Sequence, residues 1–168
     1  MKLIHFSLLL CLCSLLCLSG CKGKPANPEG RLDVSGKITL NGGPFKDAGS
    51  TLIVFEPIPG PSGSCTASFH PATGKYLCTM QNALKPGKYL VRISASVQYD
   101  RKTGKPVGPD FGLDIKEGEQ ESKLSYFVEL VPPEFNEQST IEFEVVDGKK
   151  NVFDYNIETS YVPDTTPP

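Results

Sequence analysis

The chain contains no tryptophan and little of what usually marks a catalytic or nucleic-acid-binding protein. Of its two histidines, His5 lies in an N-terminal apolar run, which leaves His70 alone for acid–base or metal chemistry. Its 17 Lys and Arg nearly balance 19 Asp and Glu, for a net charge of −2, so no basic surface for nucleic acid is expected. The lack of tryptophan also removes the largest flat surface on which a sugar ring could stack.

One long apolar run is present, and it lies at the N-terminus. Residues 3–18 are apolar, follow Lys2 and are too few for a comfortable membrane span. The small residues Ser19 and Gly20 then precede Cys21, which is the layout of a secretory signal. The tetrapeptide Leu18-Ser19-Gly20-Cys21 resembles the lipobox of bacterial lipoproteins. That resemblance implies a lipoprotein signal peptide over residues 1–20 and a lipidated Cys21 as the first mature residue.

The residues after Cys21 predict a tether. Residues 21–31 contain two prolines and two glycines, so we expect a flexible linker between the acyl chains on Cys21 and the rest of the protein. The expected partner of this end is therefore a membrane. Lys22, where sequences kept at the inner membrane have Asp, resembles sequences sorted to the outer membrane. We expect a membrane-anchored lipoprotein of the cell envelope, in the outer rather than the inner membrane, with its domain extracytoplasmic.

Alternating apolar and polar residues predict strands through most of the remaining chain. Val34, Ile38 and Leu40 alternate with polar residues, whereas Thr51 to Phe55 is a continuous apolar run expected to be covered on both faces. Seven strands are expected, in or over residues 34–40, 51–55, 65–69, 76–80, 88–97, 141–145 and 152–157. Turn residues recur about every ten positions and no helical stripe appears.

The fold class expected from this pattern is all-β, an antiparallel β-sandwich of about seven strands. The sandwich domain is expected over residues 32–158. The Pro/Thr-rich residues 159–168 are expected to form a disordered tail.

Two cysteines, Cys65 and Cys78, remain after the signal peptide and Cys21 are set aside. An even pair in an oxidising compartment favours a disulfide, and two separately buried thiols are the alternative. The loop of residues 70–75, with Gly74 in the left-handed conformation, predicts a hairpin in which the two cysteines are diagonal neighbours. One β-bulge would bring them opposite each other.

The segment of residues 98–135 breaks the rhythm of strands and turns. A connection this long is usually functional or disordered, so its aromatic side chains form the candidate binding surface. These residues are Tyr99, Phe111, Tyr126, Phe127 and Phe135. Packing of residues 126–128 beneath the segment is the alternative.

Several motifs together resemble one known family. They are Val34-Ser-Gly-Lys-Ile-Thr-Leu-Asn-Gly-Gly-Pro44, Pro71-Ala-Thr-Gly-Lys-Tyr76, Leu84-Lys-Pro-Gly-Lys-Tyr-Leu-Val91 and Val131-Pro-Pro-Glu-Phe-Asn136 followed by the strand 139–145. The pattern resembles carboxypeptidase regulatory-like, transthyretin-like (prealbumin-like) domains in short lipoproteins of planctomycete type. The resemblance covers about residues 32–158, and its motifs specify fold far better than function.

Enzymes on related scaffolds need residues that this chain lacks. A hydroxyisourate hydrolase would end in Tyr-Arg-Gly-Ser, and an intradiol dioxygenase would hold iron with two histidines and two tyrosines. A zinc site of Cys65, His70 and Cys78 fits no common spacing. The carboxylates Asp110, Asp114, Glu117, Glu119 and Glu121 do not follow an EF-hand loop. We therefore expect no enzyme, no metal and no cofactor.

The function expected from the sequence is a lipid-anchored structural or interaction module at the cell envelope. The alternative is a carbohydrate- or peptide-binding module that uses residues 98–135, with envelope polysaccharide or protein as its partner.

Overall fold

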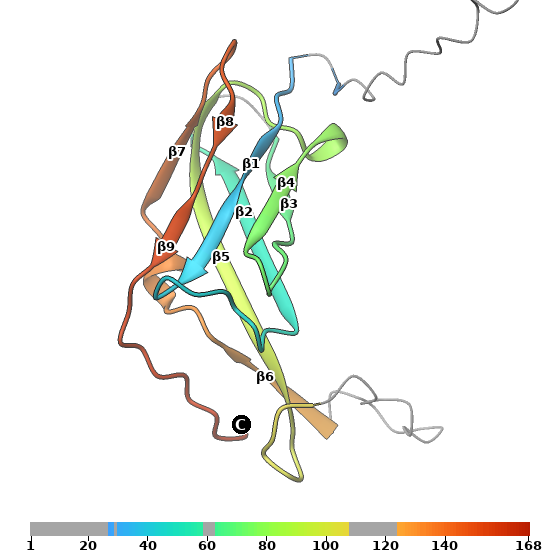
Figure 1. Cartoon of the computed structure of the whole chain (residues 1–168), viewed down its shortest axis with the longest axis vertical. Coiled ribbons are helices and arrows are strands. Elements are labelled where there is room, and N and C mark those ends of the chain that lie inside the picture. The colour runs from blue at the N-terminus through green and yellow to red at the C-terminus, as the bar shows by residue number, and fades with distance from the viewer. Residues whose placement is uncertain (1–26, 29, 59–62, 108–123) are drawn as a thin grey trace, which may run out of the picture.

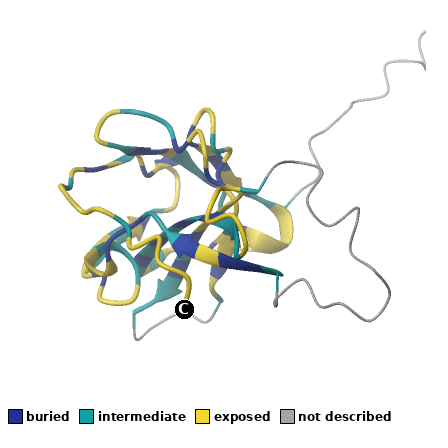
Figure 2. Ribbon diagram, turned by 90° about the horizontal axis from the view of Figure 1, so that it is seen from below, coloured by how far each residue is buried: buried dark blue, intermediate teal, exposed yellow. Residues whose placement is uncertain are grey.

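The computed structural model describes residues 27, 28, 30–58, 63–107 and 124–168, and these residues form two β-sheets packed face to face (Figure 1). Cys21 and Phe111 lie outside the described residues. Figure 2 shows the two layers from below, with exposed segments gathered in the connecting loops. None of the helices in the described part of the chain is long and apolar enough to cross a membrane.

The described residues contain nine strands and two short 3-10 helices. The strands are β1 (Val34–Leu40), β2 (Ser50–Pro57), β3 (Cys65–Ala67), β4 (Lys75–Cys78), β5 (Gly87–Asp100), β6 (Ser125–Glu129), β7 (Ile141–Val145), β8 (Asn151–Val152) and β9 (Tyr155–Ile157). The 3-10 helices are η2 (Met80–Asn82) and η3 (Pro133–Phe135).

The first sheet is built around β1. Strand β4 pairs antiparallel with one edge of β1, from Val34 opposite Cys78 to Lys37 opposite Lys75. Strands β8 and β9 both pair parallel with β1, β8 near its start and β9 near its end. The last two strands of the chain therefore pair with the first strand.

The second sheet is built around the 14-residue strand β5. Strand β2 pairs antiparallel with it and carries β3 on its other edge. Two strands divide the remaining length of β5: β7 pairs with residues 87–91 and β6 with residues 96–100. Strands β2, β6 and β7 thus pair directly with β5, and β3 is connected to it through β2.

The core lies between the sheets, where alternate residues of each strand point inward. In β5, Tyr89, Val91, Ile93 and Ala95 are fully buried, as expected for a period of two. They pack with buried residues of both sheets and of the segments that connect the strands, including Val34, Ile38, Phe45, Ile53, Phe55, Phe69, Leu84, Val145 and Ile157. The all-β sandwich expected from the sequence is confirmed.

The strand count differs from the expected seven in two places. Strand β6 lies inside the segment 98–135, and the expected strand 152–157 is divided into β8 and β9. The expectation that the run 51–55 is covered on both faces is wrong. Leu52 is 36% exposed and Val54 is half-buried, so the outer face of β2 is only partly covered by the described residues.

The division of β8 from β9 depends on a close approach to Gly36. The N–H of Phe153 donates to Ser35 O (2.9 Å), and the carboxylate of Asp154 accepts from the N–H of Lys37 (2.8 Å). The carbonyl of Phe153 thereby points over Gly36 and accepts from the hydroxyl of Tyr76 on β4 (2.9 Å). Burial, with a smaller contribution from Asp154, raises the pKa of Tyr76.

We expect the substitution Gly36→Ala to destabilise the domain by more than about 2 kcal/mol. The added Cβ would lie 1.8 Å from Phe153 O and 2.9 Å from the hydroxyl of Tyr76, so the β8–β9 backbone must move. Gly49→Ala is the matched control, since the nearest atom to its Cβ is 4.0 Å away. Urea unfolding of the two variants measures the difference, and equal stability would show that β8 and β9 do not lie against Gly36 as described.

Candidate functional site

A disulfide joins Cys65 and Cys78, as expected from the sequence. Both residues are fully buried, and their Cα atoms are 6.6 Å apart. Cys65 lies opposite Phe55 in the second sheet, whereas Cys78 lies opposite Val34 in the first. The bond therefore links the two sheets. Because both sulfurs are used in it, a zinc site of Cys65, His70 and Cys78 is ruled out.

The expected hairpin geometry around this disulfide is wrong. Strand β3 pairs with β2 and strand β4 with β1, so the two strands do not pair with each other. The turn between them is closed by the His70 N–H, which donates to Lys75 O (2.8 Å). Gly74 has the expected left-handed conformation (φ +73°), and a Cβ there would lie 2.0 Å from Ile38 O. The turn thus carries the chain from one sheet to the other.

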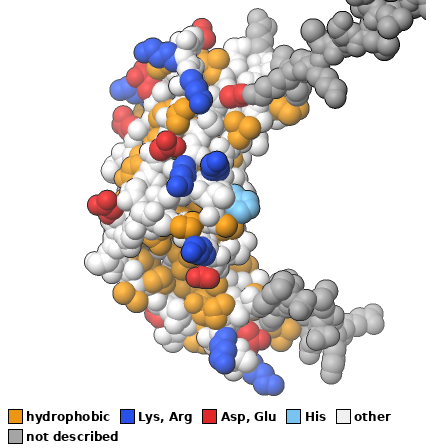
Figure 3. All heavy atoms as spheres, in the orientation of Figure 1, with side chains coloured by type: hydrophobic (Ala, Val, Ile, Leu, Met, Phe, Trp, Pro, Cys, Tyr) orange, Lys and Arg blue, Asp and Glu red, His pale blue; other side chains and the backbone are white. Residues whose placement is uncertain are grey.

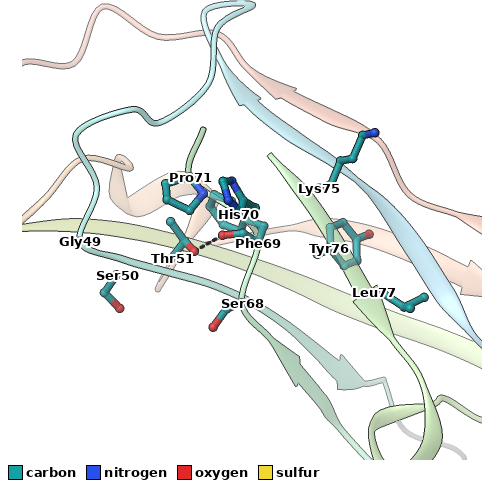
Figure 4. Close-up of a pocket in the computed structure, with 10 residues that line it drawn as sticks. All are labelled: Gly49, Ser50, Thr51, Ser68, Phe69, His70, Pro71, Lys75, Tyr76 and Leu77. Carbon is teal, nitrogen blue, oxygen red and sulfur yellow. Dashed lines mark hydrogen bonds between the residues drawn. The ribbon is translucent and has the colours of Figure 1, made fainter. Parts of the chain in front are cut away.

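An open depression of about 700 Å³ lies beside this turn. It is lined by Gly49, Ser50, Thr51, Ser68, Phe69, His70, Pro71, Lys75, Tyr76 and Leu77. In Figure 4 the side chain of Lys75 extends away from the serine hydroxyls, while Thr51 donates to the carbonyl of Phe69. Polar groups do not converge here as they do in a typical ligand site.

Three charged side chains of the second sheet, Glu56, Arg92 and Glu129, make contacts that serve the fold. Arg92 on the outer face of β5 pairs with Glu56 (3.0 Å) and donates to two carbonyls after η3. Glu129 accepts from Ser94 Oγ (2.5 Å) and from the N–H of Ala95 (2.8 Å). On the face shown in Figure 3, charges of both signs are interspersed with hydrophobic side chains. Among the described residues, no three His, Cys, Asp or Glu side chains are grouped to hold a metal ion.

The structure brings two of the predicted aromatic residues together and separates the others. Tyr99 on β5 lies directly opposite Tyr126 on β6, and their rings stack with centroids 5.6 Å apart and planes at 27°. Phe127 points to the opposite face of β6 and is 64% exposed. Phe135 lies in η3 and packs edge-on against Tyr155 at 6.2 Å. The predicted surface therefore reduces to the Tyr99–Tyr126 pair among the described residues.

An arginine that the sequence did not single out completes this pair. The guanidinium carbon of Arg101 lies 5.7 Å from the ring centroid of Tyr126, within the range of a cation–π contact. Its Nε donates to Ser125 O at 3.2 Å. Because Arg101 follows Tyr99 by two positions, strand periodicity could have indicated that both side chains share a face. We call Tyr99, Arg101 and Tyr126 the tyrosine–arginine site.

The C-terminal residues 159–168 form no strand or helix, and they contact the tyrosine–arginine site. The hydroxyl of Tyr126 donates to Thr165 O (2.7 Å), and Arg101 Nη1 donates to the main-chain oxygen of Pro168 (2.9 Å). Thr159 exchanges two hydrogen bonds with the side chain of Asn41 at the other end of the segment (2.9 and 3.0 Å). These contacts hold the segment at both ends.

Local hydrogen bonds involve one carboxylate on each side of this arrangement. Hydrogen bonds from the side chain and N–H of Thr166 lower the pKa of Asp164, whose carboxylate accepts from that N–H at 2.9 Å. Beside the site, the Thr103 N–H donates to Asp100 Oδ1 (2.6 Å) and lowers the pKa of Asp100. Both carboxylates are structural acceptors within loops.

Comparison with known proteins gives one distant similarity. No protein-family model and no curated protein matches the chain. Among solved structures, the chain is similar to the crystal structure of a candidate adhesin from Bacteroides ovatus ATCC 8483, with 14% sequence identity and a TM-score of 0.39. The similarity covers 83% of this chain and 50% of that one, so this chain spans about half the length of that protein.

Removing the inter-sheet disulfide should cost about 3 kcal/mol of stability, the value for a closed loop of about 15 residues. The double variant Cys65→Ala/Cys78→Ala, compared with the unaltered chain in urea, measures this loss. Under denaturing conditions, reduction should expose two more reactive thiols in the unaltered chain than it does in the double variant. Cys65→Ala alone should leave Cys78 reactive before reduction. If the unaltered chain gains no thiols on reduction, the bond is absent.

Proposed function

We propose that this protein is a lipid-anchored extracytoplasmic module with a structural or interaction role at the cell envelope and no catalytic activity. Acyl chains on Cys21 hold it at the membrane, and the β-sandwich presents its loops and strand ends to other envelope components. Two or more acyl chains are needed, because a single chain gives only marginal membrane affinity.

The buried disulfide is the observation that carries this proposal. Disulfides persist in oxidising compartments and are rare in the cytosol. Cys65 and Cys78 are fully buried and bonded between the sheets, so the bond belongs to the folded structure. An oxidising compartment agrees with the signal-peptide pattern of residues 1–20 and with the lipobox resemblance that ends at Cys21.

The described end of the tether is fixed to the domain. Asn27 donates to Asp33 Oδ1 (2.8 Å) and accepts from the N–H of Met80 (2.8 Å), while Arg31 donates to Ala83 O (2.7 Å). The residues from Cys21 to Asn27 can span at most about 20 Å when fully extended. The end of the sandwich formed by η2 and the start of β1 therefore stays close to the lipid.

A non-catalytic role is supported by the lack of convergent chemistry in the described residues. His70 is exposed in the turn between β3 and β4, beside a depression whose polar groups point apart. The acidic side chains Glu56 and Glu129 are occupied by structural contacts. A nucleophile, a base and an orienting group within reach of one another are the minimum for most hydrolytic sites, and they are not assembled in this part of the chain.

A second candidate function is a carbohydrate- or peptide-binding module. The stacked pair Tyr99 and Tyr126, with Arg101 beside it, is the observation that favours it. Flat aromatic rings with polar ends recur at interaction surfaces.

The anchor is tested with Cys21→Ser expressed in a bacterial host that lipidates its lipoproteins. We expect the variant to lose incorporation of labelled fatty acid and to move from the membrane fraction to the soluble extracytoplasmic fraction. Cys17→Ser, a change within the apolar run, should leave both properties unchanged. A Cys21→Ser protein that keeps its fatty-acid label in the membrane fraction would refute lipidation at this residue.

A further inference from the structure

Three buried residues at one end of the second sheet lie outside the main core. Val97, Tyr126 and Val128 are only 5%, 6% and 4% exposed, yet none of them belongs to the core cluster between the sheets. Figure 1 shows the C-terminal segment running from β9 to this end of β5 and β6. The hydrogen bonds to Thr165 and Pro168 place it against Tyr126 and Arg101. The segment therefore contacts this end of the second sheet through the hydroxyl of Tyr126 and the guanidinium of Arg101.

The composition of this segment suits the site that it contacts. Residues 162–168 read Val-Pro-Asp-Thr-Thr-Pro-Pro, and the three prolines fix φ and bias the residues before them toward extended backbone. Such a segment loses little conformational entropy on docking. Proline also donates no N–H, so these residues present mainly carbonyl acceptors, which match the donors on Tyr126 and Arg101.

The spacing of the two contacts agrees with an extended proline-rich ligand. Thr165 and Pro168 are three residues apart, which is the repeat of a polyproline II helix, so their main-chain oxygens would face the same side of such a ligand. Aromatic-lined surfaces that recognise proline-rich peptides combine flat rings with donors to ligand carbonyls. The stacked rings of Tyr99 and Tyr126 provide the first, and the Tyr126 hydroxyl and Arg101 provide the second.

We propose that the tyrosine–arginine site binds extended proline-rich peptide and that the chain's own C-terminal segment is its resident ligand. A proline-rich segment of another envelope protein binds the same site by displacing residues 162–168. This inference rests on the interaction role proposed above but not on the lipid anchor.

Displacement is favoured by a hollow that the C-terminal segment leaves open. A cavity of about 270 Å³ lies beside Tyr99, and its lining includes Pro44, Val97 and Pro106 but no residue of the segment 159–168. A longer ligand that also enters this hollow gains apolar contacts that the resident segment does not make. It must still compete with a segment whose effective concentration, set by the short connection to β9, is in the millimolar range.

The test compares the full chain with a variant that ends at Tyr161, both checked for folding by thermal unfolding. The probe is a fluorescent peptide with the sequence Val-Pro-Asp-Thr-Thr-Pro-Pro, and binding is followed by anisotropy. We expect saturable binding to the shortened chain and at least tenfold weaker apparent binding to the full chain. A peptide with all three prolines replaced by alanine should bind the shortened chain more weakly.

Point variants of the shortened chain locate the binding surface. Tyr126→Phe removes one hydrogen bond and should weaken binding about fivefold, and Arg101→Gln should weaken it at least as much. Phe127→Ala is the matched control, because this side chain lies next to Tyr126 but on the opposite face of β6, and binding should be unchanged.

A measurement on the full chain keeps the proposal testable if the shortened chain fails to fold. The heteronuclear NOE of the Thr165 and Thr166 amides should be high in the full chain and should fall in Tyr126→Phe. Three results would overturn the proposal: a folded shortened chain that does not bind the peptide, equal binding of the alanine peptide, or binding lost in Phe127→Ala but kept in Tyr126→Phe. Tyr126-dependent binding of envelope polysaccharide without peptide binding would assign the site to glycans instead. Because none of these measurements involves Cys21, their failure is distinct from failure of the anchor.

Discussion

The covalent link between the two sheets is the constraint on which the rest of the structure depends. Strand β3 belongs to one sheet and β4 to the other, and only the short turn through Gly74 connects them along the chain. The turn joins the end of β3 to the start of β4, and the bond between Cys65 and Cys78 joins the start of β3 to the end of β4. The two sheets are therefore linked at both ends of this pair of strands. The buried residues around the disulfide, Phe55 from β2 and Val34 from β1, then pack at a fixed separation. A domain of this size gains stability from such a bond chiefly by restricting the unfolded chain.

Local patterns in the sequence predicted the strands but not how they pair. The period-two alternation in β1, β5 and β7 reports which side chains are buried, and this property is independent of the neighbouring strand. The proposed pairing of residues 65–69 with 76–80 failed because nearness along the chain does not decide which sheet a strand joins. The break at Phe153 depends on Gly36, more than 100 residues away, which leaves room for the Phe153 carbonyl. Strand β6 was missed because it lies within residues 98–135, where turn residues do not recur at the regular spacing that indicated the other strands.

The candidate site was predicted only in part, because local sequence patterns do not reveal which strands pair or in which register. Tyr99 and Tyr126 were both predicted as aromatic residues of a binding surface, but their contact requires the register that places them directly opposite each other in β5 and β6. That register also sends Phe127 to the other face, so adjacent residues have different roles. Arg101 and Thr165 carry no recognisable motif. Their part in the site follows from side-chain direction at the end of a strand and from a chain segment that returns over a long distance in sequence.

The length of β5 relates the anchor to the proposed binding site. Its first residue, Gly87, follows the segment in which Leu84 bridges to Leu32 and Ala83 accepts from Arg31, at the end where the tether enters. Its last residue, Asp100, adjoins Arg101 of the tyrosine–arginine site. A strand of 14 residues is about 45 Å long at about 3.3 Å per residue, so the proposed anchor and the proposed binding site lie at opposite ends of one strand. Under the proposed lipidation of Cys21, a tether of at most about 20 Å would keep the first end near the lipid, and the proposed binding site would lie at the other end of the strand.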